Sequence, residues 1–279
     1  MDAHNIFTEI NDINRCKKIL ETLKSGVING KQFPFRYYSA YNMINKSDVN
    51  HKSIILDALE ECIDISIVNM PKLNGRTMCL SDNSGSAWGT IPTEYGSVTV
   101  AEIDNLSSVI AAMASDEGVV GKFGDKLKKF DITKRNGALM QTRQITENRC
   151  SDVGGGTEGG IWKFFKDAIN NKDKFDNIFI FSDQQAGTGG LYGTSGDQCE
   201  YLRKYGVKGS YINVYKLILE YRKKVNPKVN VFSVQTAGYN NVLIPQMSYR
   251  TAMLTGWTGK EILFANEYID FWNEKDNKS

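Results

Sequence analysis

From residue 75 onward, short apolar segments alternate along the chain with longer amphipathic segments. Strands are predicted at 76–81, 118–123, 138–144, 177–182, 229–235 and 250–255, and helices at 100–115, 159–170, 210–224 and 259–273. Such alternation is typical of proteins in which a mostly parallel sheet is covered by helices on both faces. Strands buried on both faces should be continuously apolar, as residues 178–181 are. We therefore expect an α/β fold with a doubly wound, mostly parallel sheet, and we expect the more polar segment 138–144 to be an edge strand.

The first part of the chain has a different pattern. Apolar residues recur at helical spacing between Ile6 and Leu23 and again between Ile54 and Ile67. Between these runs, Pro34 is expected to break any helix. We therefore expect an N-terminal helical segment at 1–74 and an α/β domain at 75–279.

Three oxygen-bearing side chains follow the first predicted strand at alternate positions, namely Asp82, Ser84 and Ser86. A carboxylate and two hydroxyls on one loop are hard oxygen ligands, which suit Mg²⁺ or another divalent cation. Turn residues and helix caps use the same residue types, so a turn without a metal is the alternative.

Two later segments strengthen the metal-site hypothesis. A glycine-rich stretch at 154–160 contains Thr157, and Asp183 directly follows the predicted strand 177–182. Because ligand sites of α/β proteins form outside the carboxyl ends of the strands, we expect these loops to meet the first one. The alternative is that Thr157 is only a helix N-cap and Asp183 only a capping carboxylate.

Composition and spacing disfavour most catalytic chemistries. The only histidines are His4 and His51, near the start of the chain, so a histidine-based catalytic triad is disfavoured. A phosphatase with an aspartate nucleophile needs a second acid two residues after Asp82, where this chain has Ser84. The glycines at 154, 156 and 159 match a dinucleotide fingerprint but follow a polar segment instead of a strand. We therefore expect a binding protein and no enzyme, with a Mg²⁺-dependent phosphotransfer or hydrolase reaction at Asp82 as a minor alternative.

Cysteine usage and hydropathy indicate in which cellular compartment the protein is expected. The five cysteines are scattered and never form a Cys-x-x-Cys pair, which disfavours a disulfide framework or a zinc site and favours the cytoplasm. No apolar stretch reaches the roughly 18 residues of a membrane span. The net charge of +2 does not argue for nucleic acid.

A locally basic region occupies residues 122–149, interleaved with Asp125, Asp131 and Glu147. It is either a solvated face of mixed charge or an edge that faces RNA. Its basic members are Lys122, Lys126, Lys128, Lys129, Lys134, Arg135, Arg143 and Arg149. A glycine-rich stretch at 186–210, on the expected rim of the metal site, has no assigned role.

The three polar loops resemble the metal-ion-dependent adhesion site of von Willebrand factor A (vWA) domains, in the same order along the chain. The junction 33–41, the helix through 58–64 and the segment 70–77 resemble proteins of the Ro autoantigen (TROVE) family, in which a vWA domain closes a ring of helical repeats. The glycine-rich loop ending at Thr157, residues 181–183 and residues 252–257 also resemble that family. The vWA resemblance covers about residues 75–279 and the Ro-like junction about residues 30–75.

The resemblance implies roles for the loop residues. Ser84, Ser86 and Thr157 would contact the metal directly, and Asp82 and Asp183 would bind it directly or through water. An open coordination position would accept an acidic group of a protein or RNA partner. Family members bind small non-coding RNA mainly through the helical ring, of which this chain holds about 70 residues. Either the chain is a fragment of a longer protein, or further helical repeats come from elsewhere, for example another chain. A stand-alone RNA-binding protein that uses its basic face is the alternative.

Overall fold

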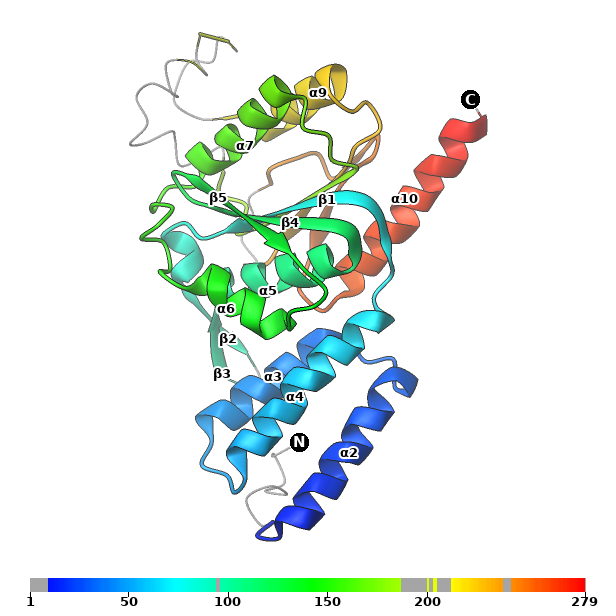
Figure 1. Cartoon of the computed structure of the whole chain (residues 1–279). Coiled ribbons are helices and arrows are strands. Elements are labelled where there is room, and N and C mark those ends of the chain that lie inside the picture. Colours follow the sequence, from blue (N-terminus) through cyan, green and yellow to red (C-terminus); the bar gives the residue numbers. More distant parts are fainter. Residues whose placement is uncertain are drawn as a thin grey trace.

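A seven-stranded sheet lies at the centre of the computed structural model, which describes residues 10–93, 96–186, 200, 203–204, 212–237 and 242–278 (Figure 1). The strand order is β5-β4-β1-β6-β7-β9-β8. The strands are β1 (Leu73–Asp82), β4 (Ser115–Phe123), β5 (Leu127–Ile132), β6 (Asn177–Ser182), β7 (Asn230–Gln235), β8 (Met247–Ser248) and β9 (Thr251–Thr255). The five strands from β4 to β9 in this order are parallel, and the edge strands β5 and β8 are antiparallel to their neighbours.

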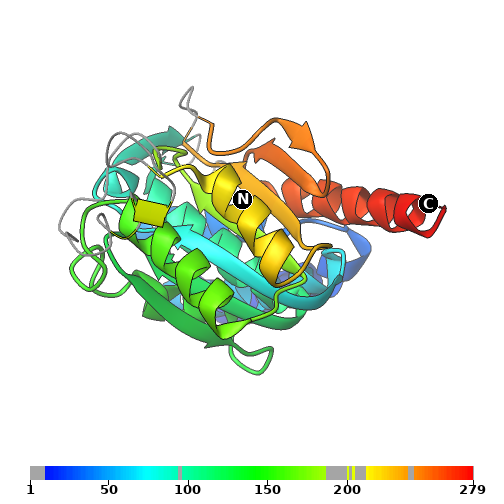
Figure 2. The same cartoon turned by 90° about the horizontal axis from the view of Figure 1, so that it is seen from above.

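Helices cover both faces of this sheet, so the predicted α/β fold class is confirmed (Figures 1 and 2). The helices α5 (Val100–Met113), α6 (Ala138–Thr146) and α10 (Lys260–Lys278) lie on one face, and α7 (Glu158–Asn171) and α9 (Val214–Lys224) lie on the other. Successive strand residues alternate between two apolar clusters. Cys79 and Phe179 pack with α5, whereas Met78 and Ile178 pack with α7 and α9.

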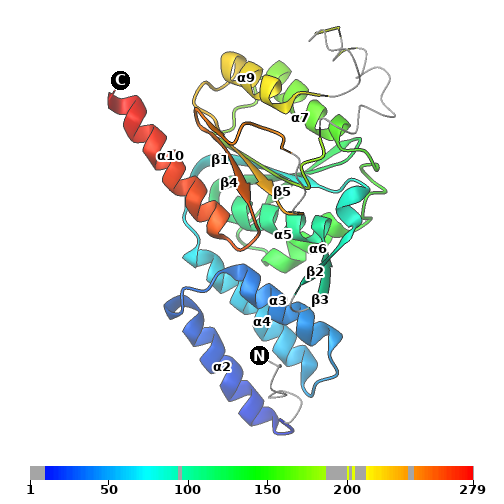
Figure 3. The same cartoon turned by 180° about the vertical axis from the view of Figure 1, so that it is seen from behind.

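In the part of the chain described before the sheet, three helices pack beneath the face that carries α5 and α6 (Figures 1 and 3). They are α2 (Ile13–Asn29), α3 (Pro34–Lys46) and α4 (Lys52–Ser66), and the short 3-10 turn η2 (Ile67–Asn69) leads into β1. Leu59 of α4 belongs to the same apolar cluster as Leu106 of α5 and Leu139 of α6. The N-terminal helices and this face of the sheet therefore share one hydrophobic core.

Local structure differs from the sequence expectation at three places. Pro34 begins α3 instead of breaking a helix, because the first helical position needs no backbone N–H donor. Residues 138–144 form α6 and not a strand, with Leu139, Thr142 and Ile145 buried along one side of the helix. The real edge strand is β5, and a hairpin of β2 (Thr90–Thr93) and β3 (Gly96–Thr99) was not predicted.

Three further expectations concern the glycine-rich stretch 186–210, membrane-spanning helices and the cysteines. Most of the glycine-rich stretch 186–210 lies outside the described residues. Among the described residues, no helix has the length and apolar character needed to cross a membrane. The described cysteines Cys16, Cys62, Cys79 and Cys150 are all free thiols.

Candidate metal-binding site

The first predicted loop folds around the carboxylate of Asp82, the last residue of β1. Asp82 Oδ1 accepts a hydrogen bond from the Ser84 N–H at 2.9 Å, and its Oδ2 accepts one from the Ser182 hydroxyl at 2.8 Å. The hydroxyl oxygens of Ser84 and Ser86 lie 3.2 Å apart. Asp82 and Ser84 are fully buried, whereas Ser86 is exposed. The alternate spacing of the sequence thus becomes one cluster of oxygen atoms that opens to solvent at Ser86.

The third loop lies beside the first because β6 pairs with β1 in parallel, with Phe181 opposite Ser81. Asp183, the residue that follows β6, is fully buried. Its Oδ1 accepts a hydrogen bond from the Gln185 N–H at 3.1 Å. Its Oδ2 is buried and has no hydrogen-bond partner among the described residues. An unpaired carboxylate oxygen in the interior is costly, so this atom is suited to a cation.

The pKa values of both carboxylates are raised above the ordinary value. Burial, and second the nearby Asp183 carboxylate, raise the pKa of Asp82 to about 7, against the opposing hydrogen bonds from Ser84 and Ser182. Burial also raises the pKa of Asp183, although Ser86 and the Gln185 N–H counteract part of that rise. Among the described residues, no basic side chain is a cause of either shift. A bound cation would supply the missing positive charge.

The second loop is joined to the first through the backbone. The Gly85 N–H donates to the Gly155 carbonyl at 2.8 Å, two residues before Thr157. Thr157 is 8% exposed and occupies the N-cap position of α7, but its side chain makes no capping hydrogen bond. The structure thus contradicts the alternative in which the Thr157 hydroxyl only caps a helix.

The structure also places a carboxylate that sequence reasoning missed. Asp104 of α5 is fully buried, and its Oδ1 accepts a hydrogen bond from the Thr236 hydroxyl at 2.6 Å. Its Oδ2 has no hydrogen-bond partner among the described residues. Burial first, then the Asp82 carboxylate, hold the pKa of Asp104 well above its usual range. The available signal was a second acid, after Glu102, in a helix whose remaining side chains are apolar or uncharged.

The donor set fits a hard divalent cation. Among the described residues, no group of three or more histidine, cysteine, aspartate or glutamate side chains is placed to bind a metal. A metal would therefore depend on hydroxyl oxygens of Ser84, Ser86 and Thr157 in addition to Asp82 and Asp183. Mg²⁺ accepts such neutral oxygens and commonly keeps water in its coordination sphere.

The basic region does not form one surface. Lys122 is fully buried, donates to the Glu147 carbonyl at 3.0 Å and pairs with Asp152 at 2.8 Å, so its assignment to an RNA-facing edge is wrong. Three further members are exposed but ion-paired: Lys128 with Asp152, Lys129 with Asp173 and Arg143 with Glu60. Lys126, Lys134, Arg135 and Arg149 are exposed. These pairs agree with a solvated face of mixed charge.

Comparison with solved structures identifies the architecture. The crystal structure of the Deinococcus radiodurans Ro (RSR) protein superposes with a TM-score of 0.65 over 92% of this chain, at 16% sequence identity. This chain has the fold of the matched part of that Ro protein. It spans about half of that relative, because the match covers 49% of the Deinococcus chain. No model of a known protein family and no curated protein matches the sequence. The resemblance found in the sequence is therefore confirmed at the level of the fold.

Proposed function

We propose that this chain is a non-enzymatic, metal-dependent binding module of a Ro-like ribonucleoprotein. The observation that carries the proposal is the pair of buried carboxylates, Asp82 and Asp183, to which the described residues offer no positive partner and of which they leave one oxygen unpaired. Hydroxyl oxygens on the same loops would complete a donor set for Mg²⁺ or another divalent cation. The absence of a histidine near this site in the sequence supports binding over catalysis.

The chain's own residues would divide the work of holding the ion. Ser84, Ser86 and Thr157 would offer hydroxyl oxygens, and Asp82 and Asp183 would bind directly or through water. Asp82 also fixes the first loop through its bond from the Ser84 N–H, which orients the serines. Because hydroxyls are neutral donors, the ion would retain an affinity for a further anionic ligand.

That ligand would arrive from the solvent side, where Ser86 is exposed. We propose an acidic group of a protein or of a small non-coding RNA, met in the cytoplasm. The likeness to a Ro protein supports the ribonucleoprotein setting. The half of the Deinococcus chain that this chain does not match would correspond to repeats supplied by another segment or chain.

Calorimetric titration with Mg²⁺ and with Mn²⁺ tests the metal site. We expect saturable binding to the wild-type chain and its loss in Asp82→Ala and in Asp183→Asn, with folding of each variant checked by circular dichroism. Asp57→Asn, an exposed change on α4, is the matched control and should bind as the wild type does. A folded wild-type protein that binds neither metal would overturn the proposal.

RNA binding through the basic region is the less supported alternative, because Lys122 is buried and three other members have acidic partners. Its signature would be metal-independent affinity that falls steeply with salt concentration. An enzymatic function would instead require Mg²⁺-dependent turnover of phosphate esters that disappears in Asp82→Asn.

A further inference from the structure

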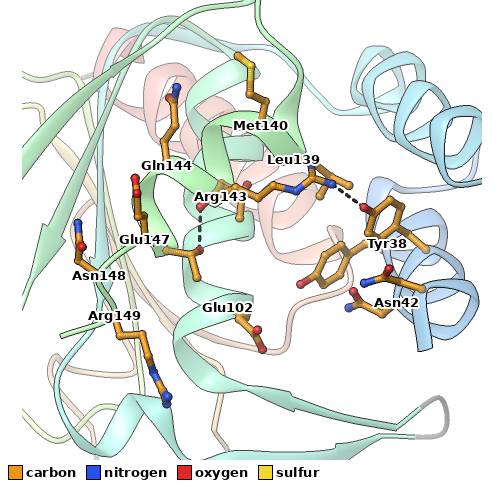
Figure 4. A pocket seen from close by; sticks show the side chains of 14 residues that line it. Tyr38, Asn42, Glu102, Leu139, Met140, Arg143, Gln144, Glu147, Asn148 and Arg149 are labelled. Atoms are coloured by element: carbon orange, nitrogen blue, oxygen red, sulfur yellow. Dashed lines mark hydrogen bonds between the residues drawn. The ribbon is translucent and has the colours of Figure 1, made fainter. Parts of the chain in front are cut away.

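A groove of about 750 Å³ runs between the N-terminal helices and the α/β domain (Figure 4). Tyr38 and Asn42 of α3 form one wall, and Glu102 of α5 and Arg143 of α6 face them from the other side. Beyond α6, the groove continues to Arg149, which lies on the side away from α3. Tyrosine and amide side chains make up much of its lining, which also contains four charged residues, namely Glu102, Arg143, Glu147 and Arg149.

The Arg149 end of this groove borders the candidate metal site. The Arg149 guanidinium lies 4.6 Å from the centre of the Trp88 ring. Trp88 belongs to the 3-10 turn η3 (Ser86–Trp88), and its indole N–H donates to the Asn83 carbonyl at 3.2 Å. The ring on which Arg149 stacks is therefore part of the loop that carries Ser84 and Ser86. Through Trp88, Arg149 is a charged residue of the groove lining that contacts the loop of the candidate metal site.

Arg149 differs from Arg143, the other arginine in the groove, in its partners. Arg143 donates to the Tyr41 hydroxyl at 2.6 Å and pairs with Glu60 at 3.3 Å. Arg149 is exposed and has no ion pair among the described residues. Its backbone holds a positive φ of 47°, and its N–H donates to the Thr146 carbonyl at 3.0 Å. The guanidinium is thus held beside the metal loop with its charge available to an anion.

Apart from the paired Arg143, the charged side chains farther along the groove are acidic. Glu147 is exposed and has no ion pair among the described residues, and Glu102 is half-buried at the start of α5. Two carboxylates along the path oppose a polyanion such as RNA, which carries a phosphate at every nucleotide. They favour a ligand whose negative charge is confined to one end. Amides of Asn42, Gln144 and Asn148 offer hydrogen bonds to a peptide backbone.

We infer that the groove receives an extended peptide segment of a partner protein, with an acidic residue at the metal beside Arg149 and a basic residue farther along, beside Glu102 and Glu147. This inference rests on the proposed metal-dependent function and names its partner. Arg149 is then the residue that adds specificity to the metal contact, because metal and guanidinium would both contact the same acidic group.

Selection of a random twelve-residue peptide display library on the immobilised full chain tests the inference, with Mg²⁺ in one arm and a chelator in the other. We expect Mg²⁺-dependent peptides that combine an acidic residue with a basic one. The selected peptides would be synthesised and their affinities measured by fluorescence anisotropy. We expect them to bind Arg149→Ala about tenfold more weakly than the wild type. Arg15→Ala removes an exposed arginine of α2, far from the groove, and should leave their affinity unchanged.

The inference would be overturned if a chain that binds Mg²⁺ in the calorimeter selected no Mg²⁺-dependent peptide. It would also be overturned if the peptides bound Arg149→Ala and the wild type with equal affinity. A third contrary result would be that a ten-nucleotide single-stranded RNA, and not a peptide, binds in a manner that depends on Mg²⁺ and Arg149. Loss of Mg²⁺ binding itself would instead overturn the underlying function. The calorimetric and anisotropy measurements thus separate the two failures.

Discussion

At the scale of single residues, Asp82 couples the stability of the metal-free protein to pH. Its pKa in the folded state is about 7, above the ordinary 3.8, so the folded chain binds more protons than the unfolded chain between these values. The free energy of unfolding of the metal-free protein should therefore fall, through this group, as the pH rises across that window. A bound cation removes the repulsion, so the rise in melting temperature on adding Mg²⁺ in place of a chelator should be larger at about pH 8 than at about pH 5.

Asp82→Asn is the control for this pH dependence, because it keeps the shape of the side chain and removes its titration. The metal-free variant should lose less stability than the wild type over the same pH range. An identical pH profile in the two proteins would show that other groups cause the dependence.

Thr157→Ala separates metal binding from folding at the second loop. The Thr157 hydroxyl makes no capping bond to α7, so its loss should leave the melting temperature of the metal-free protein almost unchanged. Mg²⁺ affinity measured by calorimetry should fall about tenfold or more, since even outer partners of metal ligands commonly contribute about 10- to 100-fold. A variant that melts early in the absence of metal would make Thr157 a structural residue instead.

The sequence indicates the loop residues of the candidate site, including Asp82 and Asp183, but not the further buried carboxylate of Asp104. The spacing of Asp82, Ser84 and Ser86 is local, so the turn that gathers them is visible in the sequence. Asp104 lies 22 residues after Asp82 on a helix, and only the packing of α5 against the sheet makes it a neighbour. Burial of Lys122 likewise depends on the later residue Asp152, which no local pattern indicates.

At the scale of elements, the glycine-rich loop owes its path to close packing on the turn between β4 and β5. A Cβ atom at Gly156 would collide with the Asp125 carboxylate, whereas one at Gly155 would meet open space. Gly156→Ala should therefore lower the free energy of unfolding by about 1–3 kcal/mol. Gly155→Ala is the matched control and should cost much less in the same denaturant titrations. Equal losses would mean that backbone entropy, and not the Asp125 contact, governs this loop.

Elements with a strong hydrophobic signal were predicted correctly, and marginal ones were not. Strand β6 is fully buried, and its continuous apolar run is typical of a central strand. Residues 138–144 contain few apolar side chains, so a helix and an edge strand are equally compatible with their pattern. Strand β5 has a mixed pattern of exposed and half-buried residues because only β4 pairs with it.

At the scale of the whole molecule, Asp64 connects the N-terminal helices to the α/β domain. Its Oδ1 accepts a hydrogen bond from the Ala138 N–H at 2.7 Å, at the start of α6, where Gly137 provides no side-chain cap. Asp64→Ala should lower the free energy of unfolding by about 1 kcal/mol, a typical loss for a missing helix cap. Asp57→Ala, on the same helix but exposed, should change it little. A thermal melt with equal shifts for both variants would contradict this role.

The sequence does not predict how the N-terminal helices pack against the α/β domain. Amphipathic periodicity predicts that α4 has an apolar side, but it does not say which element covers that side. The structure places Leu59 in one cluster with Leu106 and Leu139, residues that lie far apart along the chain. Tertiary packing, and not local propensity, therefore decides how the helical segment meets the sheet.

This shared core has a consequence for the order in which the protein is made. The ribosome synthesises α2, α3 and α4 well before α6, yet Leu139 of α6 completes the cluster that covers Leu59. The apolar sides of the first helices must therefore remain uncovered, or be shielded by chaperones, until about the middle of the chain has emerged. A pause in translation before that point would prolong the interval in which these helices can associate with the wrong partners.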